Sequence, residues 1–284
     1  MSDSRSSLGG AHAPGNPTVA EPVYDLATEV DLTESTFAEY PSDAIDDLIV
    51  VPELTIIIPM FRESTRIAQT VKTLASSPLN RDDIAFVFVD DGSCDDTADV
   101  TWRSIAEEGL RNASVQSLAT NLGKGGAVKA GMSIAKGRYL GFVDADLSLD
   151  PADVSRALAR VASTGAHIVV GERVVNPLHQ PKLRRLFSTV FRRLVWGLSG
   201  LQIADPQCAL KIFRADAAAV LFGALTTNGF AFDVEVLTRA VQRGYRIEEM
   251  KIRWEHQPGS KVNPVSDGMR MYRELLRIRR ILGS

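Results

Sequence analysis

Short apolar runs alternate with helix-like segments along most of the chain, and this alternation limits the possible folds more than any other feature. Runs rich in β-branched or aromatic residues occur at 54–58, 84–89 and 139–143, with a weaker run near 114–118. Segments with helical periodicity lie between them, and the connections are short. This pattern is typical of a parallel sheet with right-handed crossovers. We therefore predict an α/β fold with a mostly parallel, Rossmann-like sheet flanked by helices.

Polar clusters follow directly after these runs. The clusters are Pro59 to Glu63, Asp90-Asp91, Asn121 to Gly126 and Asp144-Ala145-Asp146. In sheets of this class, ligands bind at the carboxyl ends of the strands. Turn chemistry explains the glycines in these clusters but not the carboxylates, so we predict one binding site at this edge of the sheet.

Asp144 and Asp146 form the clearest candidate for a metal site. In an extended chain, residues two apart point to the same side, so both carboxylates can converge on one cation. Mg²⁺ and Mn²⁺ prefer oxygen ligands and are often held by few protein groups together with substrate phosphates. The pair therefore predicts a divalent metal bound to a phosphorylated ligand.

Two further elements suit an anion. The segment Asn121–Gly126 lacks the spacing of a P-loop and of a dinucleotide fingerprint, but it enters a helix and carries Lys124. A glycine-rich turn at a helix N-terminus can present backbone N–H groups to an anion. Arg173 ends a later apolar run at the same predicted edge, and its planar guanidinium suits a diphosphate.

Composition limits the class of protein. The chain has 284 residues, of which 45% are hydrophobic and 24% charged, and its two cysteines form no disulfide framework. We find no run of about 18 apolar residues and no signal peptide at the polar N-terminus. These features predict a protein of the reducing cytoplasm that does not span a membrane.

Charge divides the chain into a tail and a body. Residues 1–48 contain ten acidic residues and one basic residue, so they carry a net charge of −9 and the remainder +6. The tail has too few clustered apolar residues to offset its ordering entropy, and we predict that it is disordered. A solvated leader is the simpler interpretation, and a self-masking tail is the alternative. Residues 49–284 are predicted to form one domain.

Two basic amphipathic segments occur at 181–200 and 264–282. Arginine and lysine alternate there with aliphatic and aromatic residues at helical spacing. Such helices lie in membrane interfaces, but a helix packed on the core with a solvated basic face has the same pattern. The sequence leaves both interpretations open.

Taken together, the motifs resemble the family 2 inverting glycosyltransferases with a GT-A fold. The matching segments are Pro59…Glu63, Val89-Asp90-Asp91-Gly92-Ser93, Asn121-x-Gly123-Lys124 and Asp144-Ala145-Asp146. Later motifs are similar to those of dolichyl- or polyprenyl-phosphate glycosyltransferases, above all the glucosyl type. These are Asp205-x-Gln207-Cys208-x-x-Lys211-x-Phe213, Ala231-Phe-Asp233-Val-Glu235 and Trp254-x-x-x-x-Gly259-Ser260-Lys261.

The resemblance implies a role for each matching residue. It assigns nucleotide-sugar binding to Pro59, Phe61, Glu63, Asp90, Asp91, Lys124, Asp144, Ala145, Gln207 and Lys211, the metal to Asp144 and Asp146, and the catalytic step to Arg173, Asp205 and Asp233. Three positions depart from the family pattern. Phe61 offers no hydroxyl, Glu172 replaces the commoner serine before Arg173, and Ser148 stands where some relatives place a third metal ligand.

The implied reaction is metal-dependent transfer of a hexose from a nucleotide sugar, UDP-glucose above all, to a polyprenyl phosphate with inversion. The acceptor is already an oxyanion, because the second pKa of a phosphate monoester is about 6. A general base is therefore less necessary, and we expect Asp205 and Asp233 to act as positioning or electrostatic groups.

The expected partners are a nucleotide sugar, a polyprenyl phosphate and an anionic membrane surface at the cytoplasmic face. A small membrane protein or a second copy of the chain is a further possible partner, and no nucleic acid is expected. Alternatives within the class are mannose or N-acetylhexosamine as the sugar, or a soluble acceptor. Alternatives outside it are a nucleotidyltransferase and a nucleotide-sugar-binding protein without turnover.

Overall fold

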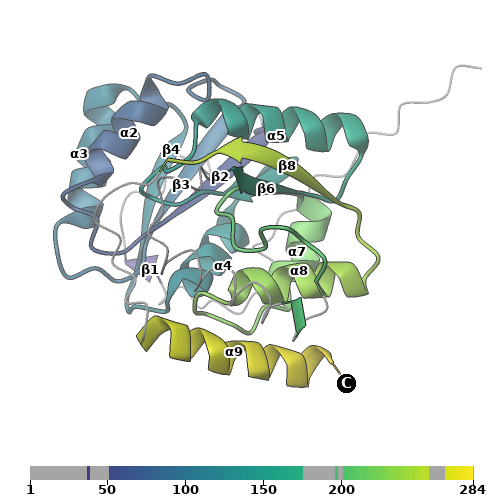
Figure 1. The fold of residues 1–284 in the computed structure, drawn as a ribbon. Coiled ribbons are helices and arrows are strands. Elements are labelled where there is room, and N and C mark those ends of the chain that lie inside the picture. The colour runs from purple at the N-terminus through teal and green to yellow at the C-terminus, as the bar shows by residue number, and fades with distance from the viewer. Residues whose placement is uncertain (1–36, 39–50, 175–195, 198–200, 256–265, 284) are drawn as a thin grey trace, which may run out of the picture.

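The computed structural model describes residues 37–38, 51–174, 196–197, 201–255 and 266–283. Over these residues the chain forms one eight-stranded sheet with the order β1-β4-β3-β2-β5-β7-β6-β8 (Figure 1). The strands are β1 (Phe37–Ala38), β2 (Leu54–Met60), β3 (Ile84–Asp90), β4 (Ala113–Leu118), β5 (Tyr139–Phe142), β6 (Ile168–Val174), β7 (Lys211–Arg214) and β8 (Ile247–Arg253). The helices are α2 (Ile67–Ala75), α3 (Thr97–Glu108), α4 (Lys124–Ile134), α5 (Pro151–Thr164), α7 (Ala215–Gly223), α8 (Phe232–Gln242) and α9 (Ser266–Leu282).

Most strands of the sheet run in one direction. β4, β3, β2 and β5 pair in parallel, as do β6 and β8. β7 is antiparallel to both of its neighbours, β5 and β6, and β1 is antiparallel to β4. Because β7 runs against its neighbours, Lys211 at its start lies opposite Phe142 at the end of β5.

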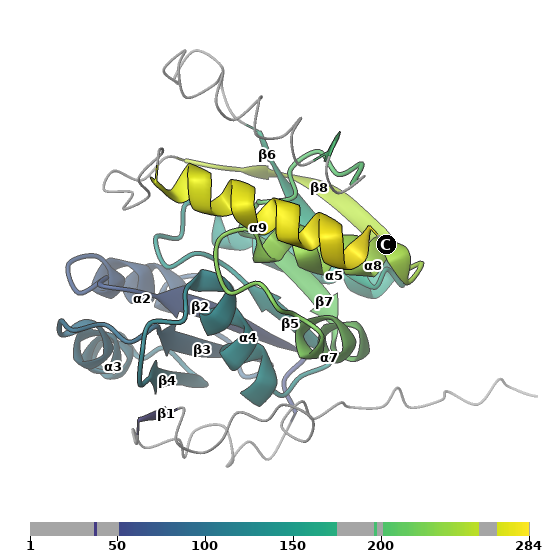
Figure 2. The ribbon, with the colours of Figure 1, turned by 90° about the horizontal axis from the view of Figure 1, so that it is seen from below.

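Helices cover both faces of the sheet. α2, α3 and α5 pack on one face, and α4, α7 and α8 pack on the other (Figure 1). α9 lies outside α8 and crosses it at the edge of the molecule (Figure 2). Two apolar cores result, one on each face, and the strands between them are buried on both sides as expected for a covered parallel sheet.

Helix α5 shows how the local sequence sets the start and end of an element. Asp150 accepts a hydrogen bond from the backbone N–H of Ala152 at 2.9 Å, and Pro151 occupies the first turn. Both features favour a helix start. The helix ends at Gly165, whose φ of 64° is readily adopted by glycine. These local signals account for both ends of α5, Pro151–Thr164.

The α/β fold with a mostly parallel sheet is confirmed, and so are the strands and helices predicted from 54 to 173. Strand β7 and helix α7 were not predicted. Lys211 occupies the first position of β7 with 0% of its side chain exposed, and a lysine in a core strand contradicts the usual apolar pattern. Its burial depends on an ion pair described below.

Most of the acidic tail and most of the first basic segment lie outside the described residues. Of the acidic tail, the structure describes Phe37–Ala38, which form β1, and of the basic segment 181–200 it describes Trp196 and Gly197. The second basic segment forms α9 over Ser266–Leu282. Among the described helices, none combines the length and the apolar character that crossing a membrane requires.

Candidate active site

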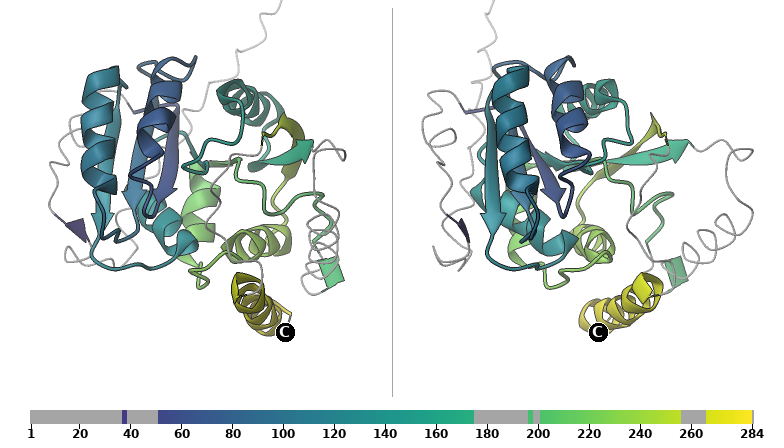
Figure 3. Two further views of the ribbon diagram at one scale, coloured as in Figure 1. Left: turned by 60° about the vertical axis from the view of Figure 1, so that its left-hand side comes forward. Right: turned by 90° about the vertical axis from the view of Figure 1, so that its left-hand side faces the viewer.

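The carboxyl ends of β2, β3 and β5 are tied together by backbone hydrogen bonds. Asp91 N, just after β3, donates to the carbonyl of Met60 at 2.8 Å, and Val143 N, just after β5, donates to the carbonyl of Ile57 at 3.1 Å. The chain then continues from β5 into Asp144 and Asp146. Three of the predicted polar clusters therefore start from one edge of the sheet, and Figure 3 shows the sheet in two neighbouring views.

Asp91 supports the glycine-rich loop. Its two carboxylate oxygens accept hydrogen bonds from Leu122 N at 2.7 Å and from Gly123 N at 2.9 Å. Burial raises the pKa of Asp91 to about 6, although these two hydrogen bonds favour the charged form. Because both oxygens are engaged with backbone, the structure gives Asp91 a positioning contact in addition to the nucleotide role that the sequence predicts.

The other predicted nucleotide residues lie around the end of β2. Pro59 is a partly exposed residue of β2, and Phe61 follows that strand with the guanidinium carbon of Arg62 5.1 Å from its ring centroid. Glu63 is buried and accepts two hydrogen bonds of 2.8 Å from Arg66. Asp90 is buried and accepts a hydrogen bond from the Ser93 hydroxyl, and burial raises its pKa.

Close backbone approach explains the glycines that open α4. Gly123 has a φ of +91°, and a Cβ at this residue would lie 2.7 Å from the carbonyl oxygen of Asn228. A Cβ at Gly125 would lie 2.6 Å from Cβ of Phe232. Gly126 N also donates to the Asn228 carbonyl at 3.1 Å. The loop before α8 is therefore packed directly against the N-terminal end of α4.

Asp144 and Asp146 are both partly exposed and follow β5. Ala145 lies between them and is buried, and its carbonyl accepts a hydrogen bond from the Thr70 hydroxyl at 2.6 Å. Asp146 Oδ1 accepts one from Ser148 N at 3.1 Å. Burying Ala145 fixes the segment so that the two carboxylates flank it. Thr70 is a supporting residue that the sequence analysis missed, because a threonine within a helical pattern carries no special signal.

Lys124 reaches the first of these carboxylates. Its ammonium lies 2.5 Å from Asp144 Oδ1, and 19% of the lysine side chain is exposed. Burial lowers the pKa of Lys124, but the charges of Asp144, Asp233 and Asp146 outweigh burial, so the net shift is upward. The first residue of α4 therefore carries a charged ammonium among three carboxylates.

Arg173 and Asp205 form a two-pronged ion pair. Arg173 Nε donates to Asp205 Oδ2 at 2.6 Å, and a terminal guanidinium nitrogen donates to Oδ1 at 2.8 Å. Burial of Asp205 opposes ionisation, but Arg173 outweighs it and holds the pKa of Asp205 below its usual value. Burial opposes ionisation of Arg173, but the hydrogen bond and charge of Asp205 outweigh burial, so the pKa of Arg173 is raised above its usual value, and the charge of Asp144 adds to this shift.

Lys211 and Asp233 form a second, fully buried pair. Lys211 Nζ donates to Asp233 Oδ1 at 2.6 Å and to the Cys208 carbonyl at 2.6 Å, with 0% and 3% of the two side chains exposed. Burial raises the pKa of Asp233, and the ammonium groups of Lys211 and Lys124 oppose that shift. The structure places Lys211 beneath the site surface. Its predicted contact with the nucleotide sugar stays a prediction, and its observed role is to fix Asp233.

Helix α9 contacts the motifs that begin at Asp205 and Ala231, a connection that sequence reasoning missed. Gln207 Nε2 donates to the Phe230 carbonyl at 3.3 Å and lies 3.1 Å from the Met271 sulfur. Glu274 accepts a hydrogen bond from Ala231 N at 3.1 Å, and burial raises its pKa. Glu274 could have been noticed as an acid within an arginine-rich helix.

The predicted metal ligands suit a divalent cation that shares its ligands with a phosphate. No group of three or more His, Cys, Asp or Glu side chains in the described part of the chain is arranged to hold a metal. Asp144 and Asp146 offer carboxylate oxygens and are not fully buried, so a bound diphosphate can complete the coordination. The donor set therefore fits Mg²⁺ or Mn²⁺ only together with a ligand.

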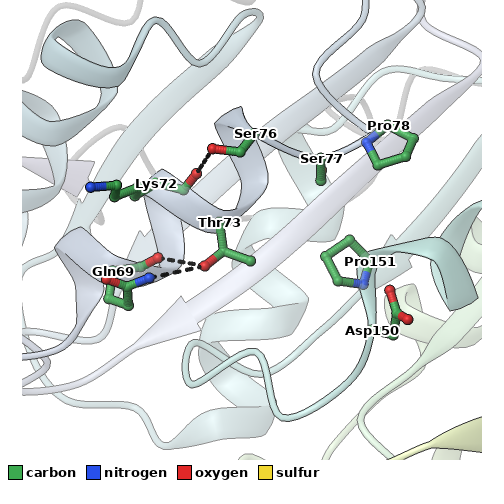
Figure 4. A pocket seen from close by; sticks show the side chains of 8 residues that line it. All are labelled: Gln69, Lys72, Thr73, Ser76, Ser77, Pro78, Asp150 and Pro151. Atoms are coloured by element: carbon green, nitrogen blue, oxygen red, sulfur yellow. Dashed lines mark hydrogen bonds between the residues drawn. The ribbon is translucent and has the colours of Figure 1, made fainter.

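A shallow depression elsewhere on the surface contains none of the predicted site residues (Figure 4). It lies between the C-terminal half of α2 and the start of α5, and its lining consists of Gln69, Lys72, Thr73, Ser76, Ser77, Pro78, Asp150 and Pro151. Its side chains are hydrogen-bonded mostly within α2 and to the α5 cap. We assign it no role in the site.

Comparison with known proteins gives a consistent result. The model of a family described as "Glycosyl transferase family 2" matches residues 55–222. A dolichyl-phosphate beta-glucosyltransferase of Dictyostelium discoideum is 29% identical over 272 residues, which cover 88% of this chain and 81% of the relative. The enzyme of the same name from Drosophila melanogaster is 32% identical over 241 residues, covering 80% and 74%.

A solved structure shares the fold. Glucosyl-3-phosphoglycerate synthase from Mycobacterium tuberculosis, in complex with Mn²⁺, uridine diphosphate and phosphoglyceric acid, superposes with a TM-score of 0.59 at 17% identity. The match covers 83% of this chain and 78% of that one. The predicted GT-A fold class is thereby confirmed.

Proposed function

The chain belongs to glycosyltransferase family 2, and we propose that it transfers glucose from UDP-glucose to a polyprenyl phosphate of the dolichyl type, with inversion at the anomeric carbon. The relatives at 29% and 32% identity are named dolichyl-phosphate beta-glucosyltransferases, which supports glucose as the sugar and dolichyl phosphate as the acceptor. The similarity to the Dictyostelium discoideum relative extends beyond the family match at 55–222 and so includes the motif around Asp233.

The observation that carries the proposal is the continuous set of charges from Asp144 to Asp233. Lys124 contacts Asp144, Arg173 is paired with Asp205, and the charge of Asp144 acts on Arg173. A sugar nucleotide and a phosphate acceptor must bring two anionic groups to one place. An edge that combines carboxylates for a cation with fixed arginine and lysine charges suits that task.

Asp144 and Asp146 would hold Mg²⁺ or Mn²⁺, which supplies charge neutralisation for the leaving diphosphate. Arg173 adds a fixed positive charge on the same side. Asp205 and Asp233 are each engaged with a basic side chain, at 2.6 Å in both cases. This supports positioning roles for the two carboxylates, because the acceptor phosphate is ionised at neutral pH and needs no base.

The proposal is tested with the purified chain and Mg²⁺, using labelled UDP-glucose with dolichyl phosphate in detergent. We expect label in the lipid extract, released by mild acid as glucose. GDP-mannose and UDP-N-acetylglucosamine test the alternative sugars, and phosphoglyceric acid tests a soluble acceptor. Label in the water-soluble product with phosphoglyceric acid, and none in lipid, would contradict the proposed acceptor.

The outer face of α9 is proposed to dock on an anionic membrane. Leu275 and Ile278 are buried against the core, whereas the opposite side exposes Met269, Tyr272 and Leu276 at helical spacing. Exposed arginines flank this apolar stripe, at Arg270, Arg273, Arg277, Arg279 and Arg280. Basic residues around an apolar stripe favour binding to anionic headgroups. This supports a peripheral position at the cytoplasmic face, where the lipid acceptor would be reached.

Reversing two of these charges should weaken membrane binding. In the double variant Arg273→Glu/Arg277→Glu, we expect partitioning onto phosphatidylserine-containing vesicles at low salt to fall by about tenfold or more. Sedimentation with the vesicles measures it. The matched control is Lys72→Glu/Arg103→Glu, which makes the same charge change on α2 and α3. Equal loss in both double variants would argue against a specific role for α9.

A further inference from the structure

The contact between Lys124 and Asp144 has a consequence for metal binding. The ammonium lies 2.5 Å from Asp144 Oδ1, an oxygen of one of the two carboxylates that are predicted to bind the metal. Asp146 and Asp233 also attract the same ammonium. A lysine cation and a divalent cation repel each other when both contact one carboxylate, so the ammonium at Asp144 opposes metal binding.

We propose that Lys124 is a resident counter-ion that occupies Asp144 until the metal arrives with a nucleoside diphosphate, and that its ammonium then moves to the diphosphate. This inference rests on the proposed function in so far as the ligand is a nucleoside diphosphate. It assigns Lys124 a positioning role that couples metal binding to nucleotide binding at one site.

The backbone around Lys124 is fixed, so only the side chain needs to move. Leu122 N and Gly123 N donate hydrogen bonds to the Asp91 carboxylate, and Gly126 N donates one to the Asn228 carbonyl. Lys124 itself carries a compact charge on a flexible four-carbon stem. Its partner Asp144 has 39% of its side chain exposed, which leaves an incoming cation access to the carboxylate.

The diphosphate is a second partner for the ammonium. Lys124 is the first residue of α4, and the N-terminal end of a helix favours anions, so a diphosphate bound there would lie near the lysine. Without nucleotide, displacing the ammonium from Asp144 leaves it without that contact, so metal binding is weakened. With nucleotide, the ammonium gains the diphosphate and the penalty is offset. Metal and nucleotide should therefore strengthen each other, as in coupled binding of about 5- to 150-fold.

The test is Mn²⁺ binding to the purified full chain, measured by the decrease of the free Mn²⁺ signal in electron paramagnetic resonance, with and without UDP. Compared with the unchanged protein, Lys124→Met should bind Mn²⁺ alone at least about tenfold more tightly, within the usual range of such couplings. UDP should then increase Mn²⁺ affinity less in the variant than in the unchanged protein. No sugar transfer is measured.

The matched control is Lys129→Met, which removes the same charge from the same helix. Lys129 Nζ donates to the Leu225 carbonyl at 3.0 Å and has no contact with Asp144 in the structure. Its Mn²⁺ affinity should match that of the unchanged protein. Lys124→Arg, which keeps the charge, should also stay close to it. If Lys124→Met fails to fold, Lys124→Gln removes the same charge and should show the same gain.

Three results would overturn the proposal. One is an Mn²⁺ affinity of Lys124→Met without UDP that is equal to or weaker than that of the unchanged protein. Another is a gain in Lys129→Met as large as that in Lys124→Met, since the loss of a charge anywhere on α4 would then be the cause. An equal gain in Lys124→Arg would also overturn it, since that variant keeps the charge. The measurement uses only protein, Mn²⁺ and UDP. Its result can therefore be interpreted even if the acceptor is not the polyprenyl phosphate of the proposed function.

Discussion

Asparagine at position 146 is expected to lower kcat/KM for lipid-linked sugar formation by about 10²- to 10³-fold, the range typical of losing one group that stabilises developing charge. The variant Asp146→Asn keeps the shape of the side chain but removes one of two carboxylates offered to the metal. Asp146 is partly exposed and accepts a hydrogen bond from Ser148 N, which the amide oxygen can still accept. The fold should therefore persist, with an unchanged unfolding midpoint.

Asp150→Asn is the matched control for this prediction. It makes the same chemical change four residues later, at the cap of α5, where asparagine is also a good capping residue. Its activity should stay close to that of the unchanged protein. If Asp146→Asn kept full activity over a range of Mg²⁺ concentrations, the assignment of Asp146 as a metal ligand would be wrong.

The second large effect concerns stability. Replacing Lys211 with methionine is expected to lower the free energy of unfolding by about 3–5 kcal/mol, because removal of one partner leaves a buried charge uncompensated. Asp233 is 3% exposed, and without the ammonium at 2.6 Å it either stays ionised and unpaired or takes up a proton, and both outcomes lower stability. Urea denaturation followed by circular dichroism measures the change.

A double variant separates the lost ion pair from lost packing. In Lys211→Met/Asp233→Leu neither charge remains, and replacing a buried pair by apolar side chains is often neutral. We expect the double variant to recover most of the loss. Arg214→Met on the same strand removes a partly exposed pair with Asp216 and should cost no more than about 1 kcal/mol. A double variant less stable than Lys211→Met alone would show that packing dominates.

The sheet could be predicted from the sequence where apolar runs are long and uninterrupted. Ile84–Asp90 is buried at every position, and its β-branched and aromatic residues make it recognisable as a strand. β7 spans four residues and begins with a lysine. Whether a lysine can lie in a core depends on a carboxylate 22 residues away in the sequence, so local pattern could not identify this strand.

The residue types of the site could also be predicted, but their pairing could not. Arg173 and Asp205 are 32 residues apart, and Asp91 and Gly123 are also 32 apart. Which charged groups meet depends on the strand order, in particular on the position of β7 between β5 and β6. A single sequence shows which residues follow each strand, but it does not show which strands are neighbours in the sheet.

The reversed direction of β7 divides the site between two independent stretches of chain. Residues 54–146 place two carboxylate clusters at the ends of β3 and β5, whereas Asp205 and Gln207 lie just before β7 and reach the same edge because β7 starts there. The segment before β7 can thus change in length or composition without altering the pairing of β2, β3 and β5.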